Sequence, residues 1–293
     1  MQSVFFERAS RGRYLSLTMI AASTLLAGPA LAEDDPRPAA GIQDNSFLIE
    51  EAYNQEAGVV QHIATLQRQR RDWFFGFTQE WPFTTQKHQV SYSIPYTWLR
   101  SDGQHAQGVG DISFHYRYQA LMESDTTPAF APRISLIVPS GNRSKGLGDG
   151  SLGVETLLPF SKIVSDRVTR HANAGMTHLF DVQGHSPTSF LLGGSAIYAV
   201  TRDFNLMLEA LVEWNESVND ARELERETTF TLNPGFRKAF NFPDDKQLVV
   251  GFATPITFSR DRTDFGLFFY LSFEHRFLPK QASNGPERRF PVK

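Results

Sequence analysis

Apolar and polar residues alternate without a break between Gly108 and Ala120, and this pattern limits what the chain can fold into. After a Gly-Val-Gly-Asp turn the stretch reads Ile-Ser-Phe-His-Tyr-Arg-Tyr-Gln-Ala, so every second side chain is apolar or aromatic. Neighbouring side chains of a β-strand point to opposite faces, so the stretch predicts a strand with one apolar and one polar face. A soluble sheet buries such an apolar face against a second layer, whereas a membrane barrel turns it toward lipid and keeps the polar face inside.

The alternation recurs along the chain and predicts twelve strands, each near the ten or so residues that cross a bilayer when tilted. No helical period competes with it after residue 58. The expected strands span 60–67, 72–81, 90–98, 111–121, 130–138, 151–160, 168–180, 190–200, 204–215, 228–236, 247–258 and 264–277. Every second connection is a short turn, and most of the others are longer polar loops, as in outer-membrane barrels with periplasmic termini.

A soluble β-sandwich is the alternative fold. Its strands would be nearer five or six residues long, and about half of the chain would have to be buried in one core. Several of the expected strands also carry aromatic residues near both ends, for example Trp73 with Trp81 and Phe204 with Trp214. Aromatic girdles at the two membrane interfaces predict that placement. The sequence therefore favours an all-β fold, a transmembrane barrel of about twelve antiparallel strands.

The N-terminus has the features of a secretory signal peptide. Arginines at 8, 11 and 13 precede a short apolar run, and Ala30-Leu31-Ala32 matches a cleavage site. The alternative is a retained anchor helix, but the apolar run is shorter than the roughly 20 residues that a span needs. We expect cleavage near Ala32, a linker with a possible plug or helix at 33–58, the outer-membrane barrel at 59–277 and a polar tail at 278–293. Within the linker, 42–55 is expected to be a short helical or irregular segment that can fold into the barrel mouth.

Composition excludes several classes of function. Removing residues 1–32 takes away three arginines and one glutamate, which changes the net charge from −3 to −5. An acidic chain does not suit nucleic acid, which attracts clustered Lys and Arg. The sequence has no cysteine, and its eight histidines show no metal-ligand spacing. We therefore expect no metal, no cofactor and no nucleic-acid partner.

Charged residues on the polar faces are the candidate functional residues of a barrel lumen. If the strands pair about the turn at 123–128, Arg117 lies opposite Arg133, and Arg133 then lies opposite Glu155. Two arginines with one glutamate leave a positive excess, which can attract an anionic or phenolate-like solute. The alternative is a structural ion-pair network that fills a small barrel. The lumen-lining candidates are His115, Arg117, Arg133, Glu155, Glu209 and Glu213, with Glu274 and Arg276 under the same ambiguity.

An enzymatic function finds little support in the sequence. A Ser-His-Asn lipase site on a twelve-stranded barrel would need those groups at the outer rim. The local candidates are His185-Ser186, in a loop, and His171 with Asn173. The Gly-x-Gly-Asp sequences at 108–111 and 146–149 are turns, because neither opens a helix as a phosphate loop does. We assign no catalytic residue and expect a protein that is not an enzyme.

Three segments together resemble one known family. They are IQDNSFLIEEAYNQEAGVVQHI (42–63), GVGDISFHYRYQ (108–119) and APRISLIVPSGNRSKGLGDGSLG (131–153). The combination is similar to the predicted outer-membrane transporters named for the meta-pathway of phenol degradation. The resemblance covers nearly all of the mature chain and implies uptake of small, often aromatic, molecules.

We therefore expect an outer-membrane channel for small hydrophobic or aromatic solutes. The alternatives are a structural or adhesive barrel with a filled lumen and, third, a lipase-like enzyme. The expected partners are outer-membrane lipid, the solute and the barrel-assembly machinery. A last strand that ends in an aromatic residue, here Phe277, resembles the signal that this machinery recognises, although a polar tail continues beyond it.

Overall fold

The computed structural model describes residues 42, 44–100, 103, 105–219, 221–244 and 246–277. The predicted signal peptide, most of the linker before residue 42 and the tail after Phe277 lie outside these residues. Within the described residues, no helix is both long enough and apolar enough to cross a membrane.

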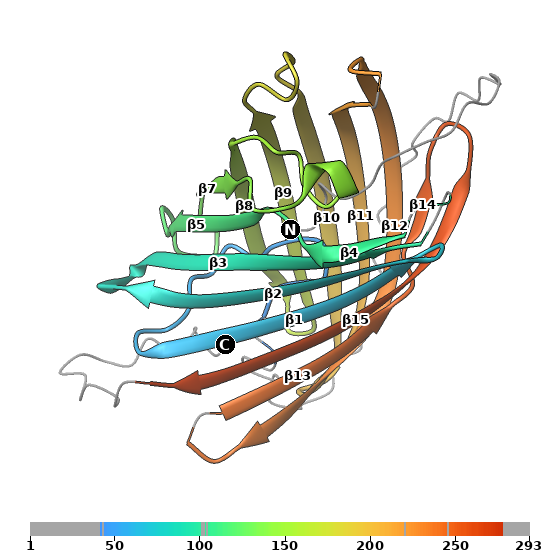
Figure 1. Ribbon diagram of the computed structural model, residues 1–293. Coiled ribbons are helices and arrows are strands. Elements are labelled where there is room, and N and C mark those ends of the chain that lie inside the picture. The colour runs from blue at the N-terminus through green and yellow to red at the C-terminus, as the bar shows by residue number, and fades with distance from the viewer. Residues whose placement is uncertain are drawn as a thin grey trace.

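The strands form one antiparallel sheet that closes on itself, because the first strand pairs with the last (Figure 1). β4 extends the pairing of β3, β6 pairs with β8, and β14 continues the line of β13, so the wall has twelve strands, as predicted. The bounds are β1 Val59–Gln69, β2 Asp72–Phe83, β3 Thr85–Leu99, β4 Ala106–Val109, β5 Ile112–Tyr118, β6 Ala129–Phe130, β7 Arg133–Val138, β8 Gly153–Ser165, β9 Val168–Leu179, β10 Thr188–Thr201, β11 Phe204–Val218, β12 Leu224–Phe242, β13 Lys246–Ala253, β14 Ile256–Phe258 and β15 Thr263–Arg276.

Some predicted boundaries were wrong for identifiable reasons. Two expected strands are interrupted, near Pro132 and at Pro255, because proline has no backbone N–H to donate to a strand neighbour. The loop expected at 99–110 contains a strand, β4, and β12 is 19 residues long because pairing continues beyond the alternating core. The segment 42–55, expected to be helical or irregular, is irregular at the residues that the structure describes.

The apolar faces point outward. Phe114, Leu192 and Phe265 are 53%, 55% and 71% exposed, whereas their polar neighbours in the strands are largely buried inside. Glu155, Glu209 and Arg237 are each at most 2% exposed. An apolar exterior around a polar interior is the distribution of a transmembrane barrel.

The two rims of the barrel differ. We call the rim where β1 begins and β15 ends the short-turn rim, since β2–β3, β8–β9 and β10–β11 are joined there by one or two residues. The opposite, long-loop rim carries the β7–β8 loop, which includes the 3-10 helix Arg143–Lys145. Asp111 holds this loop by accepting hydrogen bonds from the backbone N–H groups of Gly141 and Asp149, both at 2.8 Å. The Asp of the Gly-x-Gly-Asp turn thus fixes a loop and does not bind a phosphate.

Candidate functional site

The lumen holds a stretch of the chain itself. Residues 44–55, which we call the luminal segment, run inside the wall before the chain enters β1 (Figure 1). The segment is irregular, so its backbone groups have no partners of their own in a helix or a ladder. Ile49 and Ala52 are at most 1% exposed. A buried irregular backbone needs hydrogen-bond partners from elsewhere.

Side chains of the wall supply those partners at the middle of the segment. One oxygen of the Glu209 carboxylate accepts hydrogen bonds from the N–H groups of Leu48 and Ile49, at 2.8 and 3.0 Å. Asn173 accepts from the N–H of Glu50 at 2.7 Å and donates to its carbonyl oxygen at 2.9 Å. These hydrogen bonds all join side chains of β9 and β11 to the backbone of the segment, and none goes to its side chains.

The second half of the segment is held in the same way. The Ala52 N–H donates to Ser161 at 2.7 Å, and the side chain of Gln119 accepts from Asn54 N–H at 3.0 Å. Gln89 accepts from the N–H of Gln55 at 2.7 Å. Strands on several sides of the wall therefore contribute to one binding surface for a peptide.

Two arginines bind carbonyl oxygens of the segment. Arg117 on β5 donates to Tyr53 O at 2.8 Å, Glu51 O at 3.2 Å and Asn54 Oδ1 at 2.9 Å. Arg237 on β12 donates to the carbonyl oxygens of Asp44 and Asn45 at 2.8 and 2.6 Å. Both guanidinium groups are almost fully buried, so the segment compensates much of the cost of removing them from water.

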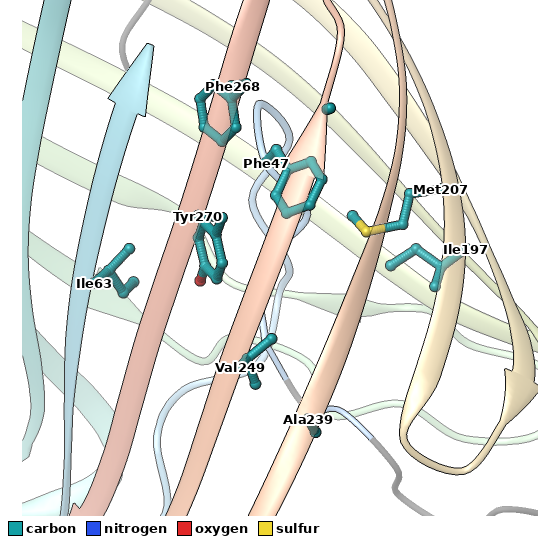
Figure 2. Close-up of a cluster of buried hydrophobic side chains, with 9 residues drawn as sticks. Phe47, Ile63, Ile197, Met207, Ala239, Val249, Phe268 and Tyr270 are labelled. Atoms are coloured by element: carbon teal, nitrogen blue, oxygen red, sulfur yellow. The ribbon is translucent and has the colours of Figure 1, made fainter.

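Glycines of the wall leave space for the apolar side chains of the segment. Phe47 packs with Phe268 and Tyr270 of β15, with ring centroids 5.4 Å apart in both pairs, as Figure 2 shows. A Cβ added to Gly251 would lie 2.5 Å from the Phe47 ring, and one added to Gly193 would lie 2.5 Å from Ile49 Cδ1. The wall and the segment are therefore complementary in shape as well as in hydrogen bonding.

The predicted charge cluster contains more acid than the sequence indicated. Arg117 lies opposite Arg133 as predicted, but Arg133 lies opposite Leu157, two residues from Glu155. Arg133 nevertheless pairs with Glu155, and also with Glu50 of the segment at 3.1 Å. Arg117 lies 3.9 Å from Glu50 and 3.8 Å from Glu80 of β2. Three carboxylates around two guanidinium groups leave no positive excess, so that expectation was wrong.

Of the other predicted lumen residues, His115 and Glu213 are buried within the wall, whereas Glu274 and Arg276 are partly exposed. His115 contacts the hydroxyls of Ser135 and Ser93 at 2.8 and 3.0 Å. Glu213 accepts from Thr229 at 3.3 Å. Glu274 lies beside Gln55 of the segment, whereas Arg276 pairs with Glu56 at the short-turn rim.

Burial changes the acidity of the segment. Glu51 is 6% exposed, and burial together with the nearby Asp44 carboxylate raises its pKa to about 8. Burial also raises the pKa of Asp44, although Arg237 and the hydroxyl of Tyr270 oppose that shift. Burial alone would also raise the pKa of Glu50, but Arg133 lowers it, so docking strengthens proton binding at Glu51 and Asp44 and not at Glu50.

A pocket lies between the luminal segment and the long-loop rim. Leu48 and Glu50 of the segment form part of its lining. Leu157, Leu191 and Leu211 make one apolar wall of the pocket. The polar part of the lining includes Glu213, Thr231, Thr257, Arg133 and Glu155.

The residues considered for catalysis lie in two separate places: His171 and Asn173 are buried inside the wall, and His185-Ser186 is in the β9–β10 loop at the long-loop rim. His171 contacts Ser161 at 2.6 Å, but both side chains are buried, and Ser161 also accepts from the luminal segment. His185 instead contacts the carbonyl oxygen of Arg222 at 3.0 Å. In the described part of the chain, no group of three or more His, Cys, Asp or Glu residues is arranged to hold a metal ion.

Comparisons with solved structures agree with the fold. An outer-membrane channel from Pseudomonas putida F1 superimposes with a TM-score of 0.59 at 13% identity, over 77% of this chain and 98% of that one. The KdgM porin gives 0.44 at 10% identity, over 74% and 99%. The CymD monoaromatic hydrocarbon channel gives 0.37 at 8%, over 78% and 90%. No family model and no curated protein matches the sequence. The chain thus has the fold of outer-membrane β-barrel channels.

Proposed function

We propose that this protein is an outer-membrane channel for small hydrophobic or aromatic compounds, closed in the present state by its own luminal segment. The observation that carries the proposal is the way the segment is held. Its backbone is bound by side chains such as Glu209 and Asn173, and it belongs to no strand of the wall. A segment held by side-chain contacts can leave the lumen without breaking any backbone hydrogen bond between strands of the wall.

The pocket supports the choice of solute. Its leucine wall offers an apolar surface, while Thr231 and Thr257 offer hydroxyl groups to a polar substituent. An apolar site with a few polar groups is the usual form of a small-molecule site. We propose that solutes enter this pocket from the long-loop rim, taken as the extracellular side, and pass inward when the segment moves.

The test is solute flux into liposomes that contain the refolded mature protein. Phenol-sized neutral aromatics should enter faster than sugars of similar size, and replacing Leu191 and Leu211 by serine should reduce that preference several-fold. Equal flux of both solute types, or equal preference in the double variant, would contradict the proposed selectivity.

A structural barrel with a filled lumen is the second candidate, because wall side chains bind the segment inside the barrel along its length. That function predicts no flux of any solute, even when the segment is removed. Recognition of the last strand by the barrel-assembly machinery is a separate proposal, supported by Phe277, the aromatic residue directly after β15. Removing residues 277–293 should then slow assembly in cells.

A further inference from the structure

Two histidines meet on the outer face of the seam where the barrel closes. His62 lies on β1 and His275 on β15, the first and last strands, which pair along the whole length of β1. Their Nε2 atoms are 3.3 Å apart, and the two rings are nearly parallel, with an interplanar angle of 15°. Both side chains are half-buried, and both lie close to the short-turn rim.

The separation of the two nitrogens fits a shared metal ion. Two nitrogen ligands of a tetrahedral zinc ion, each about 2.0–2.1 Å from it, lie about 3.3–3.4 Å from one another. The two rings are also within hydrogen-bonding distance of one another when no ion is bound. A square-planar ion such as Cu²⁺ would bring adjacent ligands to about 2.8 Å at similar bond lengths, so the geometry favours zinc.

The surroundings of the pair hold the rings in the orientation that a metal needs. His275 Nδ1 lies 3.2 Å from the carbonyl oxygen of Arg276, which can only accept, so Nδ1 carries the proton and Nε2 keeps its lone pair. Metal-bound histidines commonly donate their second N–H to a backbone carbonyl in this way. Phe77 and Phe273 are the aromatic neighbours of the His62 ring, with centroids at 6.4 and 6.5 Å.

We propose that His62 and His275 bind one Zn²⁺ between their Nε2 atoms, with water completing the coordination. Because the ligands come from the first and last strands, the ion would join the two edges of the sheet at its closing seam. Two protein ligands bind zinc more weakly than the four of a structural zinc site, so the ion would stabilise a folded barrel and is not needed to form one.

The test is calorimetric titration of ZnCl₂ into the refolded mature protein, in detergent and without a histidine tag. The wild type should bind one ion per chain, and His62→Asn and His275→Asn should each weaken binding at least tenfold. His88→Asn is the matched control, since His88 also lies on the outer face, where it contacts Tyr116 at 2.6 Å. The control should bind zinc as the wild type does.

A measurement on the wild type alone covers the case in which a variant fails to fold. Acylation of histidines should be slowed by Zn²⁺ at His62 and His275 and remain unchanged at His88. Zinc should also raise the thermal unfolding midpoint of the wild type, as any ligand of the folded state does. No binding by the wild type, or equal protection of all three histidines, would overturn the proposal.

Discussion

Glu51 is the residue of the lumen that links docking of the segment to pH. Its pKa is about 8 when docked, against 4.5 for a solvated glutamate. The docked state therefore binds the extra proton, and docking loses stability as pH rises from about 4.5 through 8. The charged groups that act on it are Asp44 and Glu80, which raise its pKa, and Arg117 and Arg237, which lower it.

Conductance of the wild type should consequently rise severalfold between pH 5.5 and 8.5. Glu51→Gln, which stays neutral, should lower the conductance at pH 8.5 and reduce its pH dependence. It should not abolish that dependence, because burial also raises the pKa of Asp44 in the docked state. Single-channel recording at both pH values checks this, and an identical pH profile in the variant would contradict it.

Gly251 tests the packing of the segment with a single added methyl group. Gly251→Ala would place a Cβ 2.5 Å from the Phe47 ring, and overpacking of this kind costs about 1–3 kcal/mol. Because Phe47 belongs to the segment, the cost should reduce docking and raise proteolysis of residues 44–55 several-fold.

Gly194→Ala is the matched control for this change. Its Cβ would meet the carbonyl oxygen of His171 at 3.4 Å, an ordinary contact, and would not reach the segment. Equal protease sensitivity of the two variants would show that docking of Phe47 does not depend on the space that Gly251 leaves for its ring.

At the scale of elements, the β7–β8 loop depends on Asp111. Asp111→Ala would leave the N–H groups of Gly141 and Asp149 without their acceptor, at a cost of about 1–3 kcal/mol. Trypsin should then cleave the loop after Arg143 or Lys145 several-fold faster. Asp125→Ala, in a turn at the opposite rim, should leave the rate unchanged, and no acceleration in Asp111→Ala would refute the role of the carboxylate.

The strands themselves follow from local alternation, which is why the stretch around Phe114 and Tyr116 predicts β5 from sequence alone. The register of Arg133 cannot be predicted from local alternation, because it depends on the interruption near Pro132. The wall residues that contact the luminal segment are harder still to predict. Gly193 and Gly251 look in sequence like two more small residues of a strand, and only the closed barrel brings them against Ile49 and Phe47. The Gln and Asn residues at inward positions were the available signal for side chains that bind the segment. Gln89 and Gln119 were not recognised as such residues.

At the scale of the whole molecule, the charge of the wall predicts the selectivity of an opened barrel. Among the described residues, the buried strand carboxylates are Glu80, Glu155, Glu209 and Glu213, and the buried strand guanidinium groups are Arg117, Arg133 and Arg237. This small acidic excess should make a channel that lacks the segment weakly selective for cations. Reversal potentials in a KCl gradient measure it. Glu209→Gln with Glu213→Gln should shift selectivity toward anions, and anion selectivity before that change would contradict the account.

The most direct test compares single-channel conductance of the wild type with that of a variant that lacks residues 33–57. The deletion removes the whole luminal segment and with it all of the segment's contacts. Because β1 begins at Val59, the wall is left complete. We predict a wild type that is closed most of the time and a deletion variant with a stable open level. A deletion variant that folds and inserts but never conducts would contradict the claim that the segment closes a channel.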